Sequence, residues 1–201
     1  MKKSILTFLA FTAMVACKKN ETTAVNNATD SPAVAAPADS GVIASDTAKT
    51  ADSMKTALSD QDKKFADAAA KGGMMEVMMG QLAATNASSQ TVKTLGEMMV
   101  KDHSKANDEL KKWASTAGYT LPTSLDADQQ KKYDDLKAKK AAEFDRSYTD
   151  LMVTDHKKDI EEFKKEATNG SEASLKSFAS TTLPTLEHHL MESEKAKSAV
   201  K

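Results

Sequence analysis

The chain has 201 residues and a formal net charge of −1, and only 5% of its residues are aromatic. This length holds one domain with appendages, and plentiful Lys, Glu, Asp and Met with few Gly and Pro suit helices rather than a β-sandwich or barrel. The near-zero charge provides no basic field that would attract nucleic acid. We therefore expect no nucleic-acid partner.

The N-terminus is typical of an export signal. Lys2 and Lys3 precede an apolar stretch over residues 5–15, which is too short to span a bilayer core of about 30 Å. Residues 14–17, Met-Val-Ala-Cys, resemble the lipobox of bacterial lipoproteins. Cys17 is the only cysteine and cannot form an internal disulfide, so acylation would account for it. The sequence predicts a signal peptide over residues 1–16 and a lipid anchor at Cys17. An ordinary signal peptide with an idle cysteine is the alternative.

Residues 17–58 have the composition of a disordered tether. Ala, Thr, Ser, Asn, Asp and Pro dominate, and the few aliphatic residues recur without a period. Such a segment cannot bury enough apolar surface to offset the entropy lost on ordering. Together with the lipid, the tether predicts a protein held at a membrane of the bacterial cell envelope. We expect the outer membrane, with the folded part facing the periplasm.

Residues 59–201 are predicted to form four long helices and a short one. Ser59 and Asp62 form a capping-box pattern at the start of the first long helix. Ser88 and Ser89 can cap the second, and Gly118 is a plausible left-handed terminator. Ser171 can cap the fourth. The predicted helices cover approximately residues 60–87, 90–118, 126–139, 141–168 and 172–197.

The lengths of the connections predict the topology. Two to four residues join the first long helix to the second and the third to the fourth, so each pair forms an antiparallel hairpin. Residues 119–140 are long enough to travel the roughly 40 Å of a long helix. We predict an all-α, ferritin-like four-helix bundle with one long crossover between helices two and three. A helical hairpin with an accessory helix is the alternative.

Each predicted core face carries one ionisable side chain when residues are placed at about 100° per position. These are Glu76, His103, His156 and His189, whereas His188 points away. Counting from the hairpin turns places them near the middle of the bundle, with His189 about one turn displaced. Because an unpaired charge or imidazole in a core is costly, such groups must pair, form hydrogen bonds or bind a metal.

Imidazoles and a carboxylate in one layer are a suitable ligand set for a divalent transition metal. Asp102 and Asp155 each immediately precede one of the histidines. They are predicted to support the site, either as ligands or by orienting an imidazole.

The helical region also contains several distinctive strings. They are Lys71-Gly72-Gly73 through Glu76-Val77 and Gly80, Met-Val-Lys-Asp-His-Ser-Lys-Ala-Asn over residues 99–107, Phe144-Asp145-Arg146 with Tyr148, Met-Val-Thr-Asp-His over residues 152–156, and Leu183-Pro184-Thr185-Leu186 with His189-Leu190. With these strings, the region from about Asp60 to Met191 resembles a bacterial family of exported ferritin-like domains of unknown function. The resemblance implies a fold and no activity.

The sequence departs from the ligand pattern of ferritin-like di-iron sites. Those sites take a Glu from each of two helices and a Glu-x-x-His motif from each of the other two. Here both motifs are missing, and Glu97, six residues before His103, is predicted to face outward. This departure argues against ferroxidase or oxygenase chemistry.

Three functions are compatible with these residues. The first is a metal-binding or metal-buffering envelope module, and the second is a non-catalytic structural or stress-related protein whose polar layer is a hydrogen-bonded network. The third is a di-metal redox enzyme of ferritin-like type. No clear catalytic signature is present, which favours a non-catalytic role. The outward Met74 and Met78 leave a surface for a protein partner, including a second copy of the chain.

Overall fold

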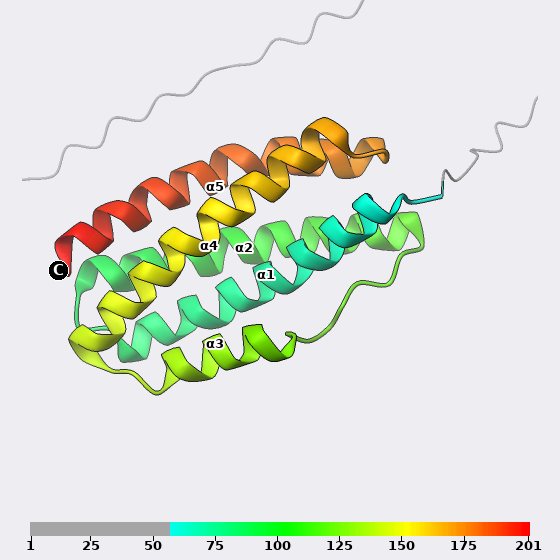
Figure 1. Cartoon of the computed structure of the whole chain (residues 1–201). Helices are drawn as coiled ribbons and strands as arrows, with labels where there is room; N and C mark the ends of the chain where they lie inside the picture. Colours follow the sequence, from blue (N-terminus) through cyan, green and yellow to red (C-terminus); the bar gives the residue numbers. More distant parts are fainter. Residues whose placement is uncertain (1–56) are drawn as a thin grey trace, which may run out of the picture. The chain divides into compact units, whose positions relative to one another are not determined.

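The structure is a computed structural model, and it describes residues 57–201. The predicted signal peptide, Cys17 and nearly all of the predicted tether lie outside these residues. The described part contains five helices and no strand (Figure 1). They are α1 (Asp60–Asn86), α2 (Gln90–Ala117), α3 (Ala127–Lys137), α4 (Ala141–Asn169) and α5 (Ala173–Ala199). None of these helices is long and apolar enough to cross a membrane.

The four long helices form the predicted ferritin-like bundle. α1 packs against α2 and α4 packs against α5 as antiparallel hairpins, and the hairpins meet through α1 with α4 and α2 with α5 (Figure 1). α3 runs back along α1, so that α2 and α4 point in the same direction (Figure 1). The crossover prediction is therefore confirmed, and every pair of adjacent long helices is antiparallel.

Contacts between helix ends agree with this topology. Near the start of α2, the Ser88 backbone N–H donates to Asp145 Oδ1 near the start of α4, at 3.1 Å. Near the end of α2, Trp113 Nε1 donates to Glu172 Oε2 at the start of α5, at 2.9 Å. α2 and α4 therefore begin at the same end of the bundle, and α5 begins at the other.

The helix boundaries reflect both local and distant capping groups. The predicted capping box is present, with Asp62 N donating to Ser59 Oγ at 3.1 Å and Ser59 N donating to Asp62 Oδ2 at 3.0 Å. Gly118 ends α2 in the left-handed conformation, with φ of 66°. The N-cap of α5 is Glu172 rather than the predicted Ser171, because the Glu172 carboxylate accepts from Leu175 N at 2.6 Å.

The crossover is fixed to the bundle along its length. Tyr119 donates to Asp67 Oδ1 at 2.9 Å, and Leu136 on α3 is buried in the core. At its far end, Asn86 Nδ2 donates to the carbonyls of Lys137 and Lys139. Because α1 contacts both ends of the crossover and the helix between them, the crossover packs against α1 along its length.

A polar layer divides the hydrophobic core into two clusters. Along α2, α4 and α5, one buried histidine lies between the residues of one cluster and those of the other. The first cluster includes Met79, Leu95, Met99, Phe144, Tyr148 and Met152, and the second includes Phe65, Leu110, Ile160, Phe163, Leu175 and Leu186. The site described below therefore lies between two apolar layers.

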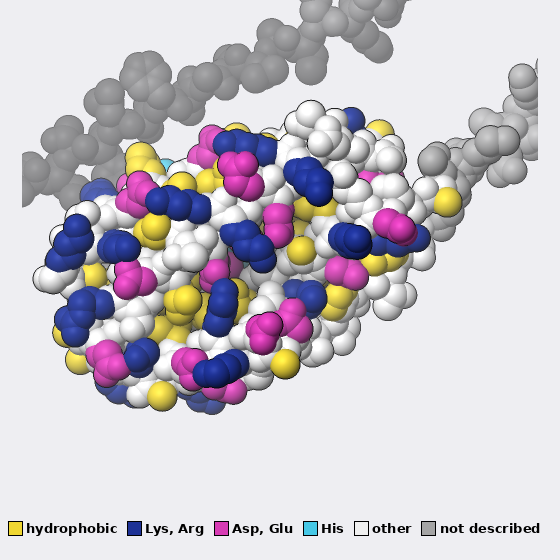
Figure 2. Space-filling view, in the orientation of Figure 1, with side chains coloured by type: hydrophobic (Ala, Val, Ile, Leu, Met, Phe, Trp, Pro, Cys, Tyr) yellow, Lys and Arg dark blue, Asp and Glu magenta, His cyan; other side chains and the backbone are white. Residues whose placement is uncertain are grey.

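On the face shown in Figure 2, Lys and Arg side chains alternate with Asp and Glu side chains. In the described part of the chain, several charged side chains form i,i+3 or i,i+4 pairs along one helix, such as Lys131 with Asp135 at 2.7 Å. Exposed pairs of this kind contribute little to stability, but they keep the helix surfaces soluble and mixed in charge.

Candidate metal centre

The structure brings three histidines from three helices together. His103 on α2, His156 on α4 and His189 on α5 are 6%, 0% and 1% exposed. Their ring centroids lie 5.2 to 5.5 Å apart, and one nitrogen of each ring lies within 4.8 Å of the others. Within residues 57–201, this is the one group of three or more His, Cys, Asp or Glu side chains arranged closely enough to share an ion.

Two oxygen acceptors determine where the protons of His156 and His189 lie. Nδ1 of His156 is 2.9 Å from the Met152 carbonyl oxygen, and Nε2 of His189 is 3.1 Å from Asp102 Oδ2. A carbonyl or carboxylate oxygen can only accept, so each of these nitrogens carries the hydrogen. A neutral imidazole has one N–H, so the other nitrogen of each ring presents a lone pair.

These two lone pairs face each other. Nε2 of His156 and Nδ1 of His189 are 3.2 Å apart, and no proton remains to lie between them when both rings are neutral. Two nitrogen ligands bound to a tetrahedral ion at 2.0–2.1 Å lie about 3.3 Å apart, so the observed spacing fits a shared cation. Nε2 of His103 is buried and has no hydrogen-bond partner in the described part of the chain.

Burial keeps all three imidazoles in the neutral form that binds metals. It lowers the pKa of His103 well below its usual value, with further lowering by the two neighbouring histidines. Burial, and then His189, lowers the pKa of His156 to about 4. The pKa of His189 is also lowered by burial, although the Asp102 carboxylate opposes the shift. At neutral pH, a metal therefore displaces no proton from the inner nitrogens.

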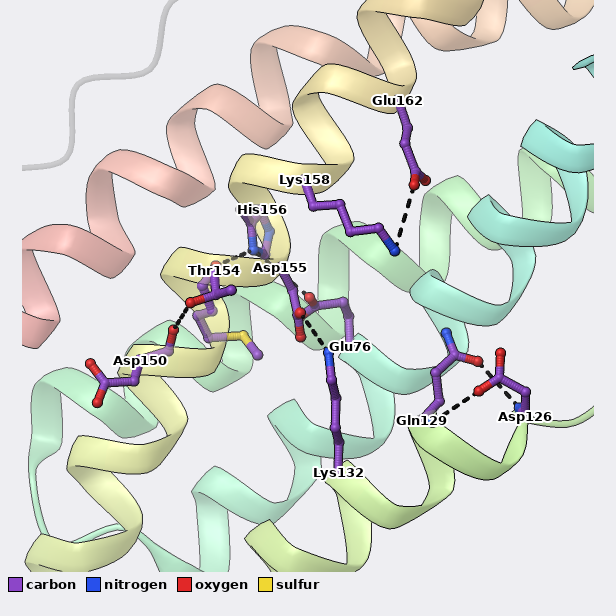
Figure 3. A network of polar contacts seen from close by, with 11 residues as sticks. Glu76, Asp126, Gln129, Lys132, Asp150, Thr154, Asp155, His156, Lys158 and Glu162 are labelled. Carbon is purple, nitrogen blue, oxygen red and sulfur yellow. Dashed lines mark hydrogen bonds and ion pairs between the residues drawn. The ribbon is translucent and has the colours of Figure 1, made fainter.

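Glu76 lies behind His156 rather than among the inner nitrogens. Its Oε1 is 3.8 Å from Nδ1 of His156 (Figure 3), whereas Nε2 of that ring is the nitrogen that lies against His189. The side chain is fully buried, and neither carboxylate oxygen has a hydrogen-bond partner among the described residues. Burial, and then the nearby Asp159 and Asp155, raises the pKa of Glu76 well above its usual range.

The two aspartates predicted to support the site occupy different positions. Asp102 contacts His189, as described above, whereas Asp155 faces α3 and its Oδ1 accepts from Lys132 Nζ at 3.0 Å (Figure 3). The structure also shows a group that the sequence did not indicate, the Met152 carbonyl one turn before His156. A backbone acceptor has no residue-type signal, so only the spacing of four residues could have suggested it. Glu97 is exposed, as predicted.

Taken together, these features define a ferritin-like helical bundle whose polar layer is a buried group of three histidines. The chain belongs to the family described as Domain of unknown function (DUF4142), which matches residues 47–196. No protein with a curated description matches the chain with significant sequence similarity.

Several solved structures share the fold. A DUF305 fragment from Deinococcus radiodurans is 9% identical with a TM-score of 0.63, over 71% of this chain and 98% of that chain. CopM in the Cu(II)-bound form is 14% identical with a TM-score of 0.60, over 70% and 97%. A predicted secreted protein, DUF305, from Streptomyces coelicolor is 13% identical with a TM-score of 0.59, over 70% and 92%. At these identities the likeness shows a common fold.

Proposed function

We propose that the bundle is a metal-binding module that holds one transition-metal ion between His103, His156 and His189. The observation that carries the proposal is the pair of inner nitrogens that face each other at 3.2 Å while their outer nitrogens are held by acceptors. An ion at this position would remove the repulsion between the lone pairs and engage the unpartnered Nε2 of His103. Asp102 and the Met152 carbonyl would orient the rings, and Glu76 would support His156 from behind.

Copper is the first candidate among the metals that imidazole binds. Divalent copper forms the most stable complexes with a given set of nitrogen ligands among first-row metals. CopM, which shares the fold, has been solved in Cu(II)-, Cu(I)- and Ag-bound forms. Zinc and nickel are the competing ions for three neutral imidazoles.

The proposal favours a binding role over redox catalysis. A ferritin-like di-metal centre takes a Glu from each of two helices and a Glu-x-x-His motif from each of the other two, whereas the group in the described residues consists of three histidines with Glu76 beside one of them. A single buried ion between two apolar clusters suits a protein that buffers or carries the metal. With the signal peptide and Cys17 anchor predicted from the sequence, the module would act in the bacterial cell envelope, at the outer membrane facing the periplasm.

The test is calorimetric titration of the protein, purified without a histidine tag, with Cu(II), Zn(II) and Ni(II), and with Cu(I) by competition under reducing conditions. We expect one equivalent to bind and the melting temperature to rise with metal concentration. His156→Ala should weaken binding at least about 100-fold, because it removes a ligand and leaves His189 without its neighbour. His188→Ala is the matched control, since this exposed side chain lies next to His189 in the sequence.

The competing function is a non-catalytic structural one, favoured by the hydrogen bonds that join His156 to the Met152 carbonyl and His189 to Asp102. On that account, His156→Ala would only destabilise the metal-free bundle, by about 1–3 kcal/mol. The absence of any binding tighter than about 100 μM for all four ions would decide for it.

A further inference from the structure

A cleft opens between α1, α3 and α4 beside the candidate centre. It has a volume of about 160 Å³ and is lined by Asp155, Asp159 and Glu162 from α4 and by Lys71 and Gly72 from α1, among others. On the α3 side, Lys132 reaches across to Asp155 (Figure 3). Three acidic side chains from one helix thus face a solvent-accessible hollow.

A second, smaller cavity adjoins this cleft and reaches one of the three histidines, His103. It has a volume of about 20 Å³. Gly72, Asp159 and Glu162 line both the cleft and the cavity, so the two spaces adjoin at these residues. A Cβ atom placed on Gly72 would have nothing within 4 Å, which shows that the junction is open on the α1 side.

The charges at the junction are only partly neutralised. Lys132 contacts one oxygen of Asp155, whose Oδ2 has no hydrogen-bond partner in the described part, and Lys158 pairs with Glu162 at 3.5 Å (Figure 3). Asp159, on the same helix, forms no ion pair within residues 57–201, and burial, followed by Glu162 and Asp155, raises its pKa to about 7, so it carries only part of a negative charge at neutral pH. Carboxylate oxygens with free lone pairs can exchange with the water ligands of a hydrated cation.

We propose that this cleft is the route by which the metal ion reaches the three histidines, with Asp159 and Glu162 as the carboxylates that take the hydrated cation from solvent. The inference rests on the proposed function of the histidines. Of the three rings, His103 is the one that borders the inner cavity, so the ion would meet this ring first, and its Nε2 has no hydrogen-bond partner in the described part. The apolar clusters at both ends of the bundle leave no comparable polar path along its axis in residues 57–201.

The experiment measures the rates of Cu(II) loading and release by stopped flow, with the equilibrium Kd determined separately. Gly72→Leu places a side chain in the junction and should slow loading and release by the same factor, about tenfold or more, because an obstacle on the route leaves the end states unchanged. Gly72→Ala adds only a methyl group to open space and should load at the wild-type rate. Equal loading rates for Gly72→Leu and wild type would overturn the proposal.

Charge variants give a second measure that does not depend on filling the junction. At pH 8, where Asp159 is ionised, Asp159→Asn and Glu162→Gln should each slow loading about three- to tenfold and weaken its dependence on salt, because they reduce the attraction of the cation. Glu97→Gln removes an exposed acid on α2 and should leave the rate unchanged. If Gly72→Leu also alters Kd, the loading rates of Asp159→Asn and Glu162→Gln decide whether the cleft is the route. Loading at the wild-type rate in both would reject the route alone, whereas a wild-type protein that binds no Cu(II) would reject the proposed function itself.

Discussion

At the histidines, the position of one proton on each ring decides which nitrogen can bind a metal. Asp102 holds the proton of His189 on Nε2, and this leaves Nδ1 free for the ion. The Asp102 side chain is 27% exposed, so its removal should disturb folding little. Without the Asp102 carboxylate, however, the His189 ring should be able to rotate and to carry its proton on either nitrogen.

We therefore expect Asp102→Ala to weaken metal binding about 10- to 100-fold, the range typical of an acceptor that orients a ligating histidine. Asp102→Asn keeps an acceptor oxygen and should recover part of the affinity. The measurement is competition with a chelator of known affinity, with Glu97→Ala as the control because Glu97 is exposed on the same helix. An unchanged affinity in Asp102→Ala would mean that this carboxylate does not orient His189.

The sequence indicated which side chains face the core but could not indicate how they meet. Burial of Glu76 and the three histidines follows from helical periodicity, which depends only on local spacing. The side of His156 on which Glu76 lies depends on rotamers and on the rotation of α1 relative to α4. Asp102 and Asp155 precede histidines in nearly matching strings, yet only Asp155 meets a lysine, because α3 lies against that part of α4.

At the scale of the helices, two glycines allow α1 and α2 to approach closely. A Cβ on Gly96 would lie 2.5 Å from Ala83 Cβ and 2.8 Å from the Gly80 carbonyl oxygen. Neither contact involves the end of a flexible side chain, so the helices would have to separate. The hairpin that carries His103 is therefore set by backbone contact.

Gly96→Ala should destabilise the protein by about 1–3 kcal/mol, as expected when a packed contact is overfilled. Gly72→Ala is the matched substitution in a helix with open space around the new methyl group, and it should stabilise the protein by up to about 1 kcal/mol because Ala favours helix. Urea unfolding of both variants provides the comparison. Effects of the same sign at the two positions would contradict this account of the α1–α2 contact.

The ends of the helices show where local prediction succeeds and where it fails. Ser59 and Asp62 lie three residues apart, so their capping box is visible in the sequence. Ser89 is the N-cap residue of α2, but its side chain makes no capping hydrogen bond, and Asp145 accepts from the N–H groups of Ser88 and Ser89 instead. A carboxylate is favoured at a helix N-terminus. Asp145, however, is 56 residues from Ser89 in the sequence, so it can cap α2 only after the bundle forms.

At the scale of the whole molecule, three helix ends meet at a pair of carboxyl groups. Asp62 on α1 accepts hydrogen bonds from Ser59 and from the Ser171 N–H between α4 and α5. Glu166 on α4 lies beside Asp62 and accepts from Gln61 Nε2 at 3.2 Å. Burial alone would raise the pKa of Asp62, but these hydrogen bonds lower it to about 2, whereas burial and then Asp62 raise the pKa of Glu166 to about 7.

The pair of carboxyl groups makes the stability of this end of the bundle depend on pH. Glu166 binds its proton more tightly in the folded protein than at its ordinary pKa of 4.5, so between pH 4.5 and 7 the folded state holds more protons than the unfolded state. The contribution of Glu166 to stability is thus fully present below pH 4.5 and is lost as the pH rises through 7. Asp62 behaves oppositely, and its contribution is lost only as the pH falls from 3.8 towards 2.

Glu166→Gln keeps the shape of the protonated acid and removes its titration. Compared with wild type, the variant should have a similar free energy of unfolding at pH 4 and should be more stable at pH 8, by about 1 kcal/mol or more. All other titrating groups, including Asp62, Lys176 and the histidines, are common to both proteins, so the difference between their urea unfolding curves isolates Glu166. A difference that stays constant from pH 4 to pH 8 would show that Glu166 does not titrate in this range. A difference in the free energy of unfolding that grows with pH would show that deprotonation of this one buried carboxyl weakens the contact between the ends of α1, α4 and α5.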